Sequence, residues 1–250
     1  MSLETVWFGS AASMLAGLAT GAGALPVLFT KNVSDKLLDV MLGFSAGVML
    51  AATFFSLLIP AIDFGGIWVA VLGLVLGAAA LHLADRFIPH FHPTLLEAEG
   101  RSSRLSRVWL FVLAVTIHNF PEGLAVGVSF GTGNIAAGLV VATAIGLQNM
   151  PEGLAVALPM LREGYGRRKS LGYSTLTGLV EPVGGLLGVA LVSVLHQVLP
   201  WALAFAAGAM LFVVSDEMIP ESHRKGFERQ ATFGLVAGFI VMMLLDFLIK

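Results

Sequence analysis

The chain has 250 residues, of which 57% are hydrophobic and only 12% are charged. A soluble globular domain carries about 25% charged residues, so this composition indicates an integral membrane protein and leaves no polar segment long enough for a second domain in 1–250. The net charge of −2, without a basic patch that includes aromatic residues, argues against a nucleic-acid partner. Cysteine is absent, which excludes disulfides, thiolate metal ligands and cysteine nucleophiles.

Eight apolar segments follow one another, each about 20 residues long and therefore able to cross a bilayer as a helix. The first is too long for the apolar core of a signal peptide and lacks a basic start, so we expect a retained helix. The predicted fold is an all-α integral membrane protein with eight transmembrane helices. They span approximately 6–29, 39–60, 65–85, 108–131, 135–160, 171–195, 200–220 and 231–249.

The positive charges are sorted to one side of this arrangement. Of the 14 Lys and Arg residues, all but Lys250 fall in the first, third, fifth and seventh connections between segments. These connections share one face of the membrane, and the positive-inside rule makes that face cytoplasmic. We therefore expect both termini on the extracytoplasmic side, an outcome that requires an even number of crossings.

Two closely related motifs stand in the fourth and fifth segments. Residues 118–126 read HNFPEGLAV and residues 148–156 read QNMPEGLAV, so that Glu122 and Glu152 each follow a proline near mid-membrane. A charged side chain at that depth costs about 3 kcal/mol on insertion scales. Two such carboxylates in the same local context predict a compensating bound cation.

A second pair of similar segments lies in the second and seventh helices. Residues 44–50 read FSAGVML, residues 205–211 read FAAGAML, and both run on to an Ile-Pro pair. In both pairs of segments the two helices point in opposite directions. Antiparallel copies are typical of the inverted repeats of transporters, whose binding site lies at the repeat interface. Resemblance by Gly and Ala composition alone is the alternative for this second pair.

The polar side chains of the motifs form one candidate site between the fourth, fifth and sixth helices. His118 and Glu122 are four residues apart and share a helix face, as do Gln148 and Glu152. The other candidates are Asn119, Asn149 and Glu181. Oxygen and nitrogen donors of this kind suit zinc, and also iron, manganese, cobalt or cadmium. Protonated carboxylates bonded between helices, or a proton pathway, are the alternatives.

At these residues the chain resembles the ZIP (Zrt/Irt-like) family of divalent metal transporters, in particular its bacterial branch. The resemblance also covers EPVGG at residues 181–185 and SDEMIPESHR at 215–224. It implies uptake of zinc or similar ions by alternating access through a binuclear centre. One metal would be held by His118, Glu122, Gln148 and Glu152, and the second by Asn119, Glu122, Asn149, Glu152 and Glu181, with Met49 nearby.

Two features depart from the family pattern. Some relatives have aspartate where this chain has Asn149, and the loss of that charge should weaken the second site. The connection between the third and fourth helices is often rich in histidine in the family, whereas here it offers only His90 and His92.

Further polar residues mark a candidate pathway on either side of the centre. Asp63 and Asp246 fall at the extracytoplasmic ends of their helices, where they would attract cations. Ser56 lies on the way inward, and a group at the cytoplasmic end of the seventh helix suggests an exit: Asp216, Glu217, Glu221 and His223. Solvated helix-end carboxylates are the alternative in both places.

The predicted function is zinc transport, with zinc as substrate, in a plasma membrane that we expect to be a bacterial inner membrane. An ion or proton channel would use the same carboxylates. An intramembrane metallohydrolase is disfavoured, because there is no HExxH motif and only one histidine in the central group. The sequence leaves open whether the protein forms a homodimer.

Overall fold

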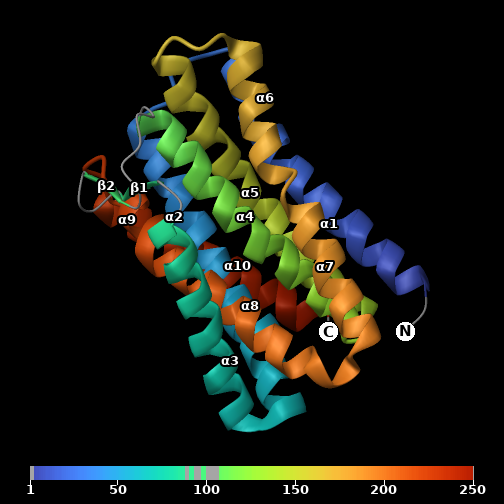
Figure 1. The fold of residues 1–250 in the computed structure, drawn as a ribbon. Helices are drawn as coiled ribbons and strands as arrows, with labels where there is room; N and C mark the ends of the chain where they lie inside the picture. The colour runs from blue at the N-terminus through green and yellow to red at the C-terminus, as the bar shows by residue number, and fades with distance from the viewer. Residues whose placement is uncertain (1–2, 88–89, 93–96, 100–106, 250) are drawn as a thin grey trace.

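The computed structural model describes residues 3–87, 90–92, 97–99 and 107–249, and in these ranges the chain is almost wholly helical (Figure 1). The helices are α1 (Leu3–Ala24), η1 (Leu25–Leu28), α2 (Asp35–Ala51), η2 (Ala52–Leu58), α3 (Ile59–Phe87), α4 (Arg107–Gly131), α5 (Ile135–Arg162), α6 (Arg167–Gly178), α7 (Glu181–Val194), η3 (His196–Val198), α8 (Leu199–Val213), η4 (Val214–Met218), α9 (Ile219–Ser222) and α10 (Glu228–Ile249). The predicted helical class of a membrane protein is confirmed.

One short hairpin interrupts the helices in the connection between α3 and α4. Strand β1 (His90–His92) pairs antiparallel with β2 (Glu97–Glu99), with Phe91 opposite Ala98. The side chains of His90 and His92, which we singled out as the only histidines of this connection, lie outside the described part of the structure.

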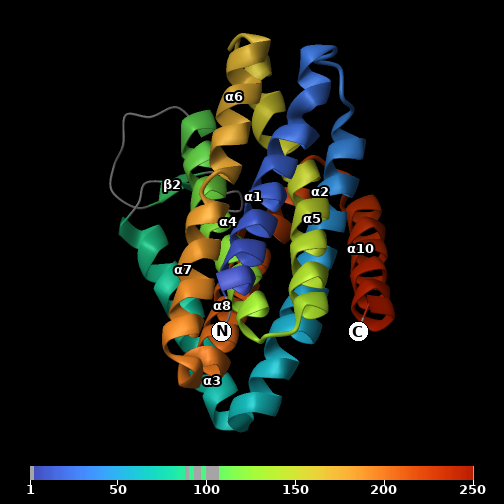
Figure 2. The ribbon, with the colours of Figure 1, turned by 90° about the vertical axis from the view of Figure 1, so that its right-hand side faces the viewer.

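Seven helical segments of the described chain are long and apolar enough to cross a membrane. One of them, Asp35–Ala84, is 50 residues long and covers the predicted helix 39–60 and all but the last residue of the predicted helix 65–85. Within it Gly66 adopts φ 79° and ψ 168°, a conformation open to glycine, and the chain turns back at that point (Figure 2). The turn lies two residues after the predicted connection 61–64, and almost no residue around it falls outside a helix.

The predicted helix 171–195 is divided into α6 and α7. The break falls at Leu179 and Val180, immediately before Glu181 and Pro182. Proline has no N–H to donate to the preceding turn, so it is tolerated in the first turn of a helix and not in its interior. The division places Glu181 at the start of α7, and its backbone carbonyl accepts a hydrogen bond of 2.8 Å from Ser13 of α1.

Both copies of the second sequence repeat continue into a π-helix. Helix α2 runs into η2 and helix α8 into η4, and each π-helix ends where an Ile-Pro pair begins, at Ile59 and at Ile219. A proline removes one hydrogen bond from the ladder before it, and π-turns are frequent at functional sites. The two segments also run in opposite directions in the structure, as Figure 1 shows for α2 and α8.

The helices pack in two groups that are each held by glycines. In the first group (α1, α4, α5, α6 and α7), Gly123 lies against the carbonyl of Glu181 and Gly153 against that of Thr20. In the second group (α2, α3, α8 and α10), Gly47 lies against the carbonyl of Leu235 and Gly208 against that of Leu74. A Cβ at any of these positions would overlap the neighbouring backbone, so each group is closely packed within itself.

Candidate metal site

The two sequence motifs place their polar side chains at the centre of the first group. Pro121 and Pro151 lie inside helices α4 and α5, which continue past them. The glycine after each glutamate brings a second helix close: Gly123 contacts the first residue of α7, and Gly153 contacts α1. As a result Glu181 of α7 faces the same interior as the two motifs.

All seven residues that we expect to bind metal are buried, with at most 3% of any of them exposed. These seven residues are His118, Asn119, Glu122, Gln148, Asn149, Glu152 and Glu181. In a chain with so few charges, three carboxylates inside one cluster indicate a site built to hold positive charge.

Hydrogen bonds join these side chains in pairs. Gln148 Nε2 donates to Glu122 Oε1 over 2.7 Å, and Asn149 Nδ2 donates to Glu181 Oε1 over 2.6 Å. Asn149 Nδ2 also donates to the carbonyl of Ala16, at 2.8 Å. Both carboxamides thus direct their NH2 groups toward a carboxylate, which leaves their oxygens for another partner.

Several buried oxygens of the cluster have no hydrogen-bond partner among the described residues. They are Asn119 Oδ1, Glu122 Oε2, Gln148 Oε1, Asn149 Oδ1 and Glu181 Oε2. A buried polar atom without a partner costs about 1–3 kcal/mol. Carboxylate and carboxamide oxygens are ligands that divalent metal ions accept, so the donor set fits such an ion.

His118 contacts a residue that lies outside the two motifs. Its Nε2 lies 2.6 Å from Oε1 of Glu217, which belongs to the π-helix η4. Among the described residues, no three His, Asp or Glu side chains lie close enough together to hold one metal ion. In this conformation the predicted ligands are therefore neighbours linked by hydrogen bonds and not a closed cage of carboxylates and imidazole.

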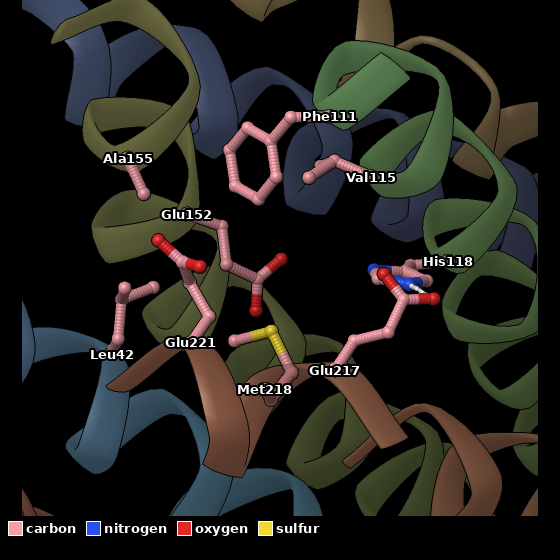
Figure 3. A pocket seen from close by; sticks show the side chains of 9 residues that line it. All are labelled: Leu42, Phe111, Val115, His118, Glu152, Ala155, Glu217, Met218 and Glu221. Carbon is pink, nitrogen blue, oxygen red and sulfur yellow. Dashed lines mark ion pairs between the residues drawn. The ribbon is translucent and has the colours of Figure 1, made fainter. Parts of the chain in front are cut away.

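A pocket opens beside His118 and Glu152, and Figure 3 shows Glu217 of η4 and Glu221 of α9 turned toward it. Its polar lining consists of His118, Glu152, Glu217 and Glu221, and its apolar lining of Leu42, Phe111, Val115, Ala155 and Met218. The two predicted exit residues Glu217 and Glu221 are thus brought to the edge of the central cluster, although they lie some hundred positions away in sequence from His118.

The other two predicted exit residues are placed differently. Both ring nitrogens of His223 have partners: Nδ1 lies 2.8 Å from Ser222 Oγ and 2.9 Å from the carbonyl of Ile219, and Nε2 lies 3.1 Å from Thr232 Oγ1. Asp216 is half-buried in η4. Neither lines the pocket of Figure 3.

The predicted entrance residues meet at the opposite end of α2 and η2. A second pocket there is lined by Ser56, Ile59, Pro60, Asp63, Phe64, Ser129, Thr132, Asn134 and Ala137. Ser56 Oγ donates to Asp246 Oδ1 of α10 over 2.7 Å, so all three predicted residues belong to this region. Met49, between the two pockets on α2, is fully buried in the hydrophobic core.

Sequence reasoning missed four residues near the site. Ser45 donates to Glu152 Oε1 over 2.6 Å and lies 3.0 Å from the carbonyl of Gln148. Asp39, Arg224 and Lys225 form ion pairs next to Glu221. Ser45 stands inside the FSAGVML repeat, where the other copy has alanine, and Asp39 is a charge within an apolar helix; both are signals that the sequence offers.

Comparison with known proteins gives the family. The model of the family described as "ZIP Zinc transporter" matches residues 96–246, more than half of the chain. The chain belongs to the ZIP family. It is 47% identical to "Zinc transporter GufA" of Myxococcus xanthus over 95% of this chain and 97% of that protein.

Two further ZIP relatives show how widely the similarity extends. "Zinc transporter ZIPB" of Bordetella bronchiseptica is 45% identical over 91% of this chain and 77% of the relative. "Zinc transporter ZIP11" of Homo sapiens is 35% identical over 91% of this chain and 93% of the relative. The resemblance to the ZIP family, which rests on the two motifs with the sequence PEGLAV, is confirmed.

Proposed function

We propose that this protein carries zinc, and related divalent metal ions, across the membrane into the cytoplasm through the buried cluster of α4, α5 and α7. The observation that carries the proposal is the set of unpartnered carboxylate and carboxamide oxygens inside an apolar helix bundle. The relatives are named as zinc transporters, not as enzymes, which agrees with metal as a substrate. Zinc would be bound and released there and not retained as a cofactor.

The cluster offers two overlapping metal positions. The first uses His118, Glu122, Gln148 and Glu152, and the second uses Asn119, Glu122, Asn149, Glu152 and Glu181. The hydrogen bonds support this grouping, since Gln148 contacts Glu122 of the first set and Asn149 contacts Glu181 of the second. Glu122 and Glu152 belong to both sets and would bridge the two ions.

The topology that we propose has eight crossings. A straight helix of 50 residues would be about 75 Å long, more than twice the hydrocarbon thickness of a bilayer, so the segment 35–84 crosses twice and turns at Gly66. The basic connections, including the one between α5 and α6, then face the cytoplasm. Both termini face outward.

We propose that the first helix group moves against the second during transport. The close glycine contacts that join α4 to α7 and α5 to α1 lie within the first group, and those that join α2 to α10 and α3 to α8 lie within the second. The polar contacts His118–Glu217 and Ser45–Glu152, by contrast, cross between the groups at the metal site. Such contacts can exchange partners as the groups move, which is what alternating access requires.

The route follows the two pockets. Metal would be attracted at the outer pocket by Asp63, which lines it with Ser56, and by Asp246, which accepts a hydrogen bond from Ser56. It would leave the central cluster through the pocket of Figure 3, past Glu217 and Glu221. The carboxylates along this line keep the ion paired with negative charge throughout.

The deciding experiment is zinc flux into proteoliposomes over a range of zinc concentrations. Wild-type protein should give saturable uptake, and Glu152→Ala should abolish it, because both metal positions lose their shared carboxylate. Glu163→Ala, which removes an exposed carboxylate at the end of α5, is the matched control and should transport normally. Flux that never saturates would show a channel, and normal flux through Glu152→Ala would rule out this route.

A further inference from the structure

Glu221 forms ion pairs with two basic residues, Arg224 and Lys225. Arg224 Nε lies 2.9 Å from Glu221 Oε2, and Arg224 Nη2 donates to Glu221 Oε1 over 2.9 Å. The two contacts make a fork in which both oxygens of one carboxylate are occupied by one guanidinium, the strongest geometry for such a pair. Only 6% of Glu221 is exposed, so water does little to screen it.

Lys225 extends this arrangement to a second helix. Its Nζ lies 3.7 Å from Glu221 Oε1 and 3.6 Å from Asp39 Oδ1 on α2. Asp39 is fully buried, and neither of its oxygens has a hydrogen-bond partner among the described residues. The ammonium group of Lys225 is therefore the positive charge that this buried carboxylate faces.

The same Glu221 lines the pocket that also contains Glu152 and Glu217. A carboxylate with free oxygens at this pocket would attract a departing divalent cation, and tight binding on the way out slows release. A carrier turns over only if the exit binds its ion weakly. A guanidinium is always charged and is fixed to the chain, so it competes with the metal for Glu221 at every passage.

We propose that Arg224, with Lys225 beside it, is a built-in competitor for the metal ion at Glu221 and thereby speeds release to the cytoplasm. The inference rests on the proposed route past Glu217 and Glu221. Arg224 acts through Glu221 and is a positioning residue that does not touch the ion. In its absence Glu221 turns its free oxygens to the pocket and retains the ion.

The test is Arg224→Gln, assayed by zinc flux in proteoliposomes and by equilibrium zinc binding to the purified protein. We expect tighter binding, with KM and Kd for zinc about tenfold lower, because the lost pair is a charge-assisted hydrogen bond. Maximal flux should fall severalfold at the same time, since release becomes slower. If Arg224 had only a structural role, its loss would damage the fold and weaken zinc binding, so that Kd for zinc would rise instead of falling.

Arg167→Gln is the matched control. Arg167 is exposed, and its Nη1 donates to the carbonyl of Leu28 over 2.7 Å, a contact away from the pocket of Figure 3 that does not join the two helix groups. It should leave KM and flux unchanged. The double variant Arg224→Gln with Glu221→Gln should lose the extra affinity, because the carboxylate that retained the ion is gone.

The outcomes separate this inference from the proposed route. If Glu217→Gln and Glu221→Gln both transport zinc as the wild type does, the route itself is wrong. If those variants are impaired while Arg224→Gln binds zinc no more tightly than the wild type, the competitor role is wrong. Should Arg224→Gln fail to fold, Arg224→Met removes the charge and keeps an unbranched side chain, and an unchanged KM in that variant would overturn the inference.

Discussion

The two carboxamides show how the side chains of the proposed metal site are held together by hydrogen bonds. Gln148 and Asn149 are adjacent in sequence, yet they point to different carboxylates, Glu122 and Glu181. Each donates through nitrogen and presents a buried oxygen that has no partner among the described residues. A carboxamide can do both because it is donor and acceptor at once, whereas a carboxylate would repel its neighbour. The choice of Asn149 therefore stabilises the metal-free cluster.

Replacing Asn149 by aspartate should destabilise the metal-free cluster and strengthen the binding of zinc. In Asn149→Asp the two hydrogen bonds to Glu181 Oε1 and the carbonyl of Ala16 are lost, and a carboxylate faces another at about the 2.6 Å that the amide spans. We expect the metal-free protein to melt at a lower temperature than the wild type, and zinc to raise the melting temperature of the variant more than that of the wild type. Zinc per protein should approach two.

Thermal unfolding with and without zinc, combined with metal analysis after equilibrium dialysis, measures both effects. Asn32→Asp, at an exposed position outside the bundle, adds the same charge and is the control. Unchanged zinc content and an unchanged response to zinc in Asn149→Asp would show that this position is no part of a second metal position.

At the scale of elements, the site depends on how closely helices approach. Gly123 and Gly153 follow the two glutamates and let the backbones of α7 and α1 reach α4 and α5. Small residues are the usual means by which membrane helices pack closely. The PEG motif thus combines a carboxylate with the glycine that brings the next helix to it, and Glu181 enters the cluster only because of that approach.

Gly123→Ala tests this link. The new Cβ would overlap the carbonyl of Glu181, so α7 must shift, at a cost of about 1–3 kcal/mol. We expect zinc flux to fall at least tenfold and zinc affinity to weaken, although no ligand has been changed. Gly172→Ala is the control, because nothing lies within 4 Å of an added Cβ there. Equal flux in the two variants would show that the α4–α7 approach does not position the site.

The arrangement of the helices also shows which features of the site cannot be predicted from the sequence. The motifs predicted which side chains are buried together, since a shared proline and glutamate in apolar helices are local signals. The contact of His118 with Glu217 and that of Asp39 with Lys225 join residues that are far apart in the chain, so no local pattern predicts them. The π-helices η2 and η4 shift the register of the backbone by one residue, which apolar periodicity does not resolve.

At the scale of the whole molecule, the question is whether the two helix groups move relative to each other. Figure 1 and Figure 2 both show the ends of α5 and α6 extending beyond the start of α2 and α10. The first group is thus displaced along the bundle axis, toward the end where α5 meets α6. The pocket beside Glu152 has walls from both groups, with Leu42 from α2 and Ala155 from α5. A displacement of one group would open or close this pocket.

The absence of cysteine from the chain makes this motion testable by crosslinking. Leu42→Cys with Ala155→Cys, joined by a short bifunctional thiol reagent, ties α2 to α5 across the two groups. We expect zinc flux to fall to background after crosslinking and to be near normal before it, because alternating access needs the groups to slide. His82→Cys with Phe212→Cys ties α3 to α8 within the second group, where the two rings lie 6.1 Å apart, and should leave flux intact. Equal flux before and after the cross-group link would mean that transport proceeds without relative motion of the groups, as in a channel.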